Sequence, residues 1–225
     1  MKSNIKLIYI FVIVLLANTY SKAQFNAGDS FLQGSFNVQQ PLSSSDNFST
    51  QKNYSIGVDW GKYNTKNTAR ILSLNINYTN QDYQYSAVQS KDLNISLNKG
   101  HEYYKSIFGK IGIYGRIMGG VNYGNLQSTT FQSSSSIGYT QQTINSIGLN
   151  LTGNGGIMYR LNDKWAFTGN LLNLNVASVG YSWTDGKRSP LQGGSSENFT
   201  QKQFDYNFSP KVAFSYGLGI RYIIK

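Results

Sequence analysis

The C-terminal stretch of this chain alternates large and small residues over positions 212–224, and this pattern limits the possible folds more than any other feature. The large residues on one face are Val212, Phe214, Tyr216, Leu218, Ile220, Tyr222 and Ile224. Small residues and Arg221 lie between them, with Ile223 as the one large exception. Since successive side chains of a strand point to opposite faces, this period of two predicts a β-strand with one apolar face. About 9–11 residues of tilted strand are enough to cross a bilayer.

Seven further segments repeat the alternation, which makes eight predicted strands. They lie at 32–38, 54–60, 72–78, 92–98, 111–123, 147–160 and 165–182. In the last of these the phase slips near Leu171 and Leu172, which predicts a β-bulge. The chain is therefore predicted to be all-β, an eight-stranded antiparallel up-and-down barrel.

The composition favours a barrel with an apolar exterior and a polar interior. Charged residues make up 13% of the chain, against about 25% in ordinary soluble proteins. A soluble barrel of the lipocalin kind would fill its interior with large apolar side chains and present many charges outside. Here the second face is mainly Gly, Ser, Asn and Thr, and aromatic residues gather near the strand ends, as they do at membrane interfaces. A soluble barrel or sandwich is the alternative.

The first 23 residues follow the pattern of a secretory signal peptide. Basic residues precede an apolar run at 7–17, and small residues mark a cleavage site between Ala23 and Gln24. The run is too short to span a bilayer as a helix, although a short N-terminal membrane helix is an alternative. We therefore expect an exported chain whose residues 24–225 form the barrel domain. The absence of Cys excludes disulfides and a lipid anchor on Cys.

The predicted connections alternate between long and short. Long polar segments lie near 39–53, 80–91, 124–144 and 183–203, and short ones lie near 63–68, 105–110 and 161–164. Outer-membrane barrels have long extracellular loops and short periplasmic turns. The alternation therefore predicts both termini in the periplasm. It also makes the loops 124–144 and 183–203 candidates for binding an extracellular ligand.

Together these features resemble the outer-membrane protein β-barrel domain family, in particular small barrels of the OmpX/OmpA type. The resemblance covers residues 24–225 and includes the short turn at 161–165 and the glycine-alternating last strand. It implies a free-standing barrel in the cell outer membrane of a Gram-negative bacterium, with outer-membrane lipid and the barrel assembly machinery as partners. Such barrels often end in an aromatic residue that this machinery reads, whereas this chain ends in Ile224 and Lys225.

Charged residues at inward positions are the main candidates for a functional site. These residues are Asp59, Glu102, Arg116, Arg160 and Arg221. They could line an ion pathway, as charged rings do in channels. They could instead pair with one another and plug the lumen, because buried charges need neutralising partners. An eight-stranded barrel is only just wide enough for its own side chains, so we favour the plug.

The sequence offers little for catalysis, for a metal or other cofactor, or for nucleic-acid binding. His101 is the only His, and its neighbour Glu102 points to the opposite face of the strand, so the two cannot easily share a catalytic triad. The formal charge is +10, but apart from Lys187 and Arg188 the basic residues are scattered singly. We therefore expect a non-enzymatic membrane protein with a structural or surface-binding role. A narrow, porin-like pore for small solutes and a lipid-modifying enzyme are the alternatives.

Overall fold

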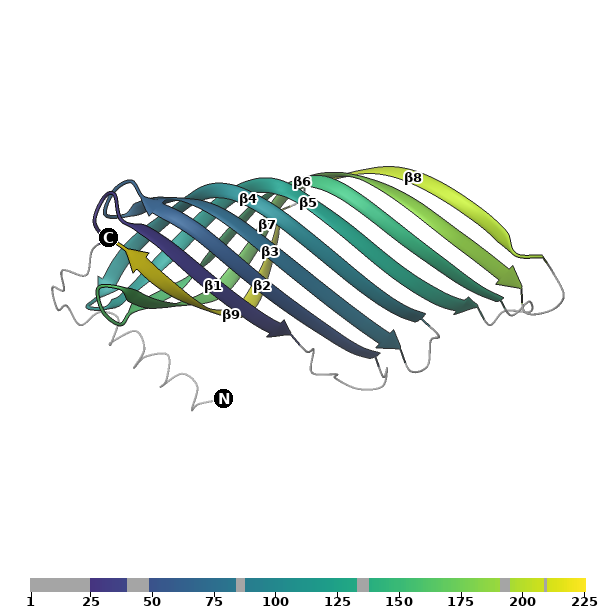
Figure 1. The fold of residues 1–225 in the computed structure, drawn as a ribbon, viewed down its shortest axis with the longest axis horizontal. Coiled ribbons are helices and arrows are strands. Elements are labelled where there is room, and N and C mark those ends of the chain that lie inside the picture. Colours follow the sequence, from purple (N-terminus) through teal and green to yellow (C-terminus); the bar gives the residue numbers. More distant parts are fainter. Residues whose placement is uncertain (1–24, 40–48, 84–87, 133–137, 191–194, 209) are drawn as a thin grey trace.

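The computed structural model describes residues 25–39, 49–83, 88–132, 138–190, 195–208 and 210–225 (Figure 1). The expected signal peptide at 1–23 and its cleavage site before Gln24 lie outside the described residues. No helix among the described residues has the length and apolar character needed to cross a membrane. The described chain is built from antiparallel strands, as predicted.

Nine strands make one sheet. They are β1 (Ser30–Gln39), β2 (Ser49–Tyr63), β3 (Thr68–Tyr83), β4 (Val88–Phe108), β5 (Ile111–Gln132), β6 (Gly138–Arg160), β7 (Trp165–Pro190), β8 (Glu197–Asn207) and β9 (Lys211–Ile224). Their order in the sheet is β6-β5-β4-β3-β2-β1-β9-β7-β8, and pairing of β6 with β7 closes the ring. Most strands pair with their neighbours in sequence, which is the up-and-down arrangement expected from the sequence.

The ring has eight positions because β8 and β9 occupy one of them in succession. The first part of β7 pairs with β9 between Trp165 and Asn175, and the last part pairs with β8 between Ser178 and Arg188. The register of β7 shifts between Asn170 and Leu172, so the predicted bulge is confirmed. The eight-stranded ring predicted from the sequence is therefore present, with its last strand in two parts.

Three of the predicted long loops, 80–91, 124–144 and 183–203, were wrong in extent, since most of their residues belong to strands, whereas residues 40–48 of the first loop lie outside the described part of the chain. β5 and β6 pair without interruption up to Gln132 and Gly138, inside the segment 124–144. β8 lies largely inside the predicted loop 183–203. These segments lack apolar alternation, but Thr, Gln and Ser continue the backbone ladder, as in the pair Thr130 with Thr140. The point where the alternation stops in the sequence is therefore the edge of the apolar outer surface, whereas the strands themselves continue beyond it.

Short turns join successive strands at all three predicted places, although the one predicted at 105–110 is only the pair 109–110, because β4 continues to Phe108. In the turn that follows β6, the side chain of Asn162 accepts hydrogen bonds from the backbone N–H groups of Lys164 and Trp165, both at 2.9 Å. In the turn between β4 and β5, Gly109 has a φ of 51°, which a glycine adopts without steric cost. These tight turns all lie at the end of the barrel that holds the C-terminus (Figure 1).

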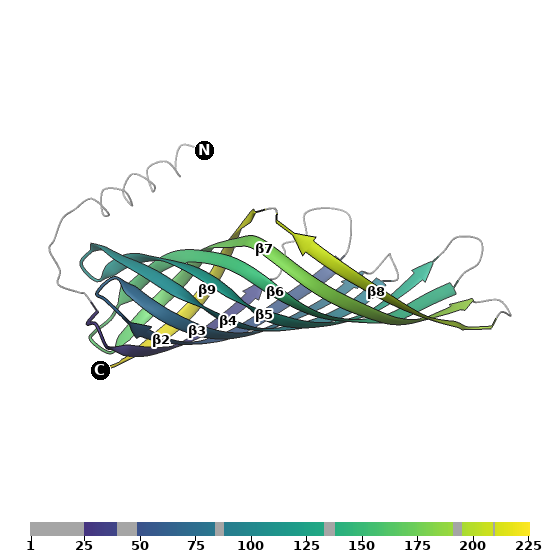
Figure 2. The ribbon, with the colours of Figure 1, turned by 90° about the horizontal axis from the view of Figure 1, so that it is seen from above.

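The cylinder is closed at the end with the short turns and opens toward the other end. β1 pairs with β9 only from Ser30 with Ile224 to Phe36 with Leu218. Beyond this point the strands continue as a curved sheet, which Figures 1 and 2 show extending away from the closed end. The barrel thus has a narrow closed half and a wide open half.

The outer face of the sheet is an apolar belt, defined here by two rows of residues that are direct cross-strand neighbours. The first row is Leu218, Phe36, Ile56, Ile76, Ile95, Tyr123, Ile147 and Tyr181. The second row is Ile220, Gly34, Val58, Leu74, Leu97, Val121, Leu149 and Val179. Every side chain of the first row is exposed. The large residues of the alternating pattern therefore point outward, as the composition predicted.

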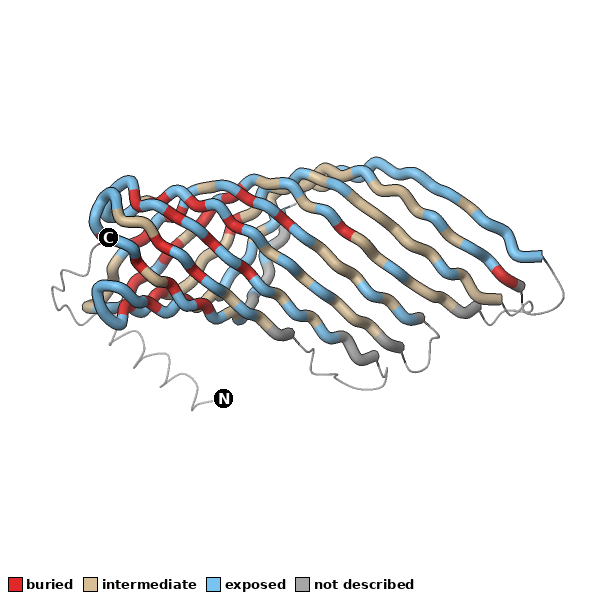
Figure 3. The backbone as a smooth tube through the Cα atoms, in the orientation of Figure 1, coloured by how far each residue is buried: buried red, intermediate tan, exposed pale blue. Residues whose placement is uncertain are grey.

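The apolar core lies inside the closed end, where Figure 3 shows most of the buried residues. Phe25 stacks on Tyr63 with ring centroids 4.3 Å apart and meets Tyr104 edge-on at 5.0 Å. Ile223, the exception in the alternation of the last strand, is 1% exposed and belongs to the same cluster. We call this cluster the aromatic base, because it fills the barrel between the short turns and the polar interior.

Candidate functional site

A network of buried charges, the charge plug, crosses the lumen next to the aromatic base. Its members are Gln33, Asp59, Glu102, Arg116 and Arg221. Gln33 is the cross-strand neighbour of both Arg221 and Asp59, whereas Glu102 faces Arg116 across the pair β4–β5. Side chains from two parts of the ring therefore meet in the middle of the barrel.

Arg221 is the best-connected residue of the plug. Its Nη1 and Nη2 atoms donate to the two carboxylate oxygens of Glu102, each at 2.7 Å. Nη1 also donates to the hydroxyl of Tyr63 at 2.7 Å, and Nε donates to the side-chain oxygen of Gln33 at 2.9 Å. The guanidinium lies 3.9 Å from the ring centroid of Phe31. Such forked contacts to a carboxylate fix geometry as well as charge.

Arg116 joins the second acid to the plug. Its Nη1 donates to Asp59 at 2.7 Å, its Nε donates to Glu102 at 2.8 Å, and its Nη2 donates to Gln33 at 3.1 Å. The hydroxyl of Ser73 donates to the other oxygen of Asp59 at 2.6 Å. Two acids and two bases thus balance one another, each at most 5% exposed. Burial of this kind is tolerated because every charge has a partner.

The structure brings together four of the five charged residues that the sequence singled out. The fifth, Arg160, lies at the end of β6, where it forms an ion pair with Asp163 at 3.2 Å and lies over the ring of Phe25. His101 is exposed on the outer face, as expected, with Arg70 and Ile117 as cross-strand neighbours. Its neighbour Glu102 points into the plug.

Sequence reasoning missed three neutral residues that hydrogen-bond to the buried charges, namely Gln33 of the plug and its neighbours Tyr63 and Ser73. Gln33, Tyr63 and Ser73 share the inward phase of their strands with the charged residues. That phase was visible in the sequence, but a neutral polar residue on an inner face did not stand out among so many Ser and Asn. For Gln33 and Ser73 the signal that could have found them is their register opposite Arg221 and Asp59, whereas Tyr63 lies opposite Ala69.

Above the plug, away from the aromatic base, the interior widens into a cavity of about 540 Å³ that we call the amide chamber. One cross-strand row of its wall is Ser35, Gly57, Asn75, Ser96, Asn122 and Gly148. The residues that line the chamber include many Asn and no charged side chain. The wall therefore offers amide donors and acceptors without net charge.

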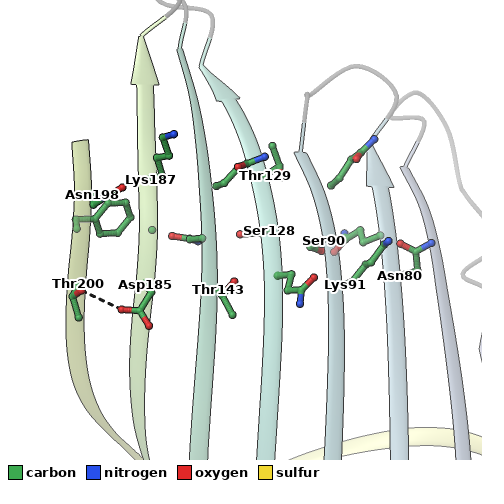
Figure 4. Close-up of a pocket in the computed structure, with 17 residues that line it drawn as sticks. Asn80, Ser90, Lys91, Ser128, Thr129, Thr143, Asp185, Lys187, Asn198 and Thr200 are labelled. Atoms are coloured by element: carbon green, nitrogen blue, oxygen red, sulfur yellow. Dashed lines mark hydrogen bonds between the residues drawn. The ribbon is translucent and has the colours of Figure 1, made fainter. Parts of the chain in front are cut away.

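A second hollow, the outer trough, lies farther along the same strands on the open half of the sheet (Figure 4). It measures about 720 Å³ and is lined from β3 to β8, mostly by Gln, Ser, Thr and Asn. Its charged residues are Lys91, Asp185 and Lys187. Asp185 accepts a hydrogen bond from the hydroxyl of Thr200 at 3.1 Å (Figure 4).

The inner face of β4 contributes residues to the charge plug, the amide chamber and the outer trough, in that order. Glu102 belongs to the plug, Asn98 and Asn94 line the chamber, and Ser90 lines the trough. Most side chains of the trough, such as Gln89 and Lys91 on either side of Ser90, have the outward phase of Leu93 and Ile95. Within the part of the chain that the structure describes, no three His, Cys, Asp or Glu side chains are grouped closely enough to hold a metal.

Comparison with known proteins found similarity to solved structures only at the level of architecture. No family model and no curated protein matches the chain. A major outer membrane protein from Thermus thermophilus is 13% identical, with 88% of this chain and 100% of that chain covered and a TM-score of 0.48. OprG from Pseudomonas aeruginosa is 16% identical, with 88% and 97% covered and a TM-score of 0.40. Neisserial surface protein A is 12% identical, with 88% and 97% covered and a TM-score of 0.37.

The chain's own strand pairing and burial define its class. The strands form an antiparallel up-and-down ring, large apolar side chains cover its outside, and polar side chains and a balanced charge network fill its inside. A soluble barrel would place these two kinds of side chain the other way round. The protein therefore has the architecture of a small outer-membrane β-barrel.

Proposed function

We propose that this protein is a non-enzymatic, non-conducting barrel of the outer membrane that presents a polar binding cavity to the outside of the cell. The observation that carries the proposal is the charge plug, which lies between the amide chamber and the closed end. A cavity with a floor of buried, mutually neutralised charges is suited to holding a ligand and not to passing one.

The apolar belt supports the membrane location. Leu218 is 78% exposed and Phe214 is 79% exposed, although both are large apolar residues on the same strand. In water such a continuous apolar surface would drive aggregation, whereas in a bilayer it contacts lipid. The short turns then face the periplasm and the outer trough faces the exterior, because long hairpins are extracellular in this class of barrel.

The plug and the aromatic base argue against the narrow pore. A conducting lumen needs a continuous water-filled path with a charged or polar wall. Here Arg221 and Glu102 meet across the lumen, and Phe25, Tyr63 and Tyr104 pack beneath them. These contacts fill the cross-section that an ion would use.

The placement of His101 argues against a lipid hydrolase. The imidazole lies on the outer face, whereas the nearest acid in sequence, Glu102, is buried in the plug with two Arg partners. A catalytic acid must hydrogen-bond to the histidine that it orients. Glu102 is committed elsewhere, so its role is structural.

Reconstitution into planar bilayers tests this proposal. The wild-type protein, folded in detergent and checked by its heat-modifiable gel mobility, should give no resolved current steps in concentrated KCl. A porin inserted into the same membranes is the positive control. Stable, reproducible steps from the folded wild-type protein would overturn the non-conducting assignment and favour the pore.

A further inference from the structure

The amide chamber contains buried hydrogen-bonding groups that the described part of the chain leaves without a partner. These groups are the side-chain oxygens of Asn37, Asn98, Asn150 and Asn154. All four residues line the chamber. Buried polar side chains are usually hydrogen-bonded, since an unmade bond costs free energy. Four unpartnered acceptors around one cavity therefore indicate a surface built to receive donors from something inside it.

The backbone makes room for these amides. Gly120 lies directly opposite Asn98 in the ladder, and a side chain at this glycine would collide with the amide of Asn98. At Gly57 a Cβ atom would lie 2.6 Å from both the amide oxygen of Asn75 and the hydroxyl of Ser35. Glycine beside asparagine thus keeps the wall thin and the amides free to point inward.

We propose that the amide chamber binds a neutral, hydroxyl-rich ligand, that is, a carbohydrate. This inference rests on the proposed function, because it names the ligand class for the cavity of a plugged barrel. Sugar hydroxyls supply donors for the free amide oxygens and accept from amide N–H groups. The volume of about 540 Å³ falls within the usual range for small-molecule sites.

The chemistry of the wall selects against other ligand classes. A charged ligand would find no opposite charge among the lining residues, and the charges of the plug below are already paired. An apolar ligand would bury the four amide oxygens without replacing their hydrogen bonds, which is costly. A neutral ligand with many hydroxyls needs no opposite charge and can hydrogen-bond to the amide oxygens.

Titration calorimetry with defined sugars tests the proposal. Maltose, cellobiose and N,N′-diacetylchitobiose serve as neutral probes, and a disaccharide that contains glucuronic acid serves as the charged probe. At least one neutral disaccharide should bind the folded protein in detergent, and the acidic one should bind more weakly. Asn150→Leu should weaken that binding by about tenfold or more, since it removes a buried amide that would contact the sugar.

The matched control is Asn145→Leu, the same substitution on β6 but with the phase of the outer face. It should change affinity less than about twofold, because the side chain lies outside the chamber. Failure of all neutral probes to bind at millimolar concentration would overturn the proposal, as would binding that Asn150→Leu leaves unchanged. Gel mobility and conductance are measured on the same samples. A folded, silent barrel that binds no sugar would therefore refute this inference alone.

Discussion

Arg221 of β9 and Glu102 of β4 form a forked ion pair across the lumen, with both N–O distances at 2.7 Å and both side chains fully buried. The two residues are 119 positions apart in the sequence. Glu102 also accepts from Arg116 at 2.8 Å, so one carboxylate holds two guanidinium groups in place. The plug therefore depends on this acid more than on any single base.

Replacing Glu102 tests that dependence. Glu102→Ala leaves two buried guanidinium groups short of a partner and should lower the free energy of unfolding by about 3–5 kcal/mol. Urea unfolding in lipid, followed by tryptophan fluorescence, measures the change. The control Glu197→Ala removes an exposed acid from β8 and should have an effect within about 0.5 kcal/mol. Similar stabilities for the two variants would contradict the role assigned to the plug.

The outward direction of the apolar belt predicts a depth-dependent cost for charge. Leu218→Arg places a charge in the middle of the belt and should destabilise the folded protein by about 2–4 kcal/mol in lipid. Tyr222→Arg lies near the end of the same strand, where the cost should fall to about 0–1 kcal/mol. Folding yields in vesicles, read from the heat-modifiable gel shift, compare the two variants. Equal yields would mean that this face does not meet a hydrocarbon layer.

Two glycines on opposite faces provide the complementary test of the interior. At Gly219 a Cβ would lie 2.5 Å from the hydroxyl oxygen of Thr168 and 3.0 Å from the carbonyl oxygen of Gly34. Gly219→Leu should therefore destabilise by about 1–3 kcal/mol through overpacking. At Gly34, which is exposed on the outer face, a Cβ would meet nothing within 4 Å, so Gly34→Leu should fold nearly as well as wild type. The opposite ranking would mean that the two faces of the sheet are assigned the wrong way round.

The proposed orientation can be tested with single thiols, because the chain has no Cys of its own. Lys187→Cys lies in the outer trough and should react with a membrane-impermeant maleimide on intact cells. Lys164→Cys lies in the short turn after β6 and should react only after the outer membrane is permeabilised. Labelling of Lys164→Cys alone on intact cells would place the closed end outside.

The ring of strands was predictable from the sequence because each strand crosses the apolar belt and therefore alternates. The bulge near Leu171 was visible for the same reason, as a slip in that phase. The upper parts of β5 and β6 could not be found in this way, since Thr, Gln and Ser on both faces leave no period to detect. In β8 only the last part alternates, at Phe204 and Tyr206, so its first part was predicted to be a loop, and its separation from β9 depends on the pairing of both strands with β7.

The charge plug was predictable as a set of inward charges but not as a geometry. Strand phase places Asp59, Glu102, Arg116 and Arg221 on the inner face, whereas their pairing depends on the stagger between strands. Arg160 has the same phase but lies near the end of its strand, so Asp163 in the adjacent turn became its partner. The amide chamber was hidden because no single Asn is unusual in such a chain.

The position of Arg221 in the last strand also bears on biogenesis. Glu102 and Gln33 are synthesised long before Arg221, which donates hydrogen bonds to both of them. A copy whose translation or insertion stops before β9 would hold an acid without its main partner and an open ring. Closure of the ring and pairing of the buried acid therefore both require β9, which pairs with β1 and β7 and carries Arg221.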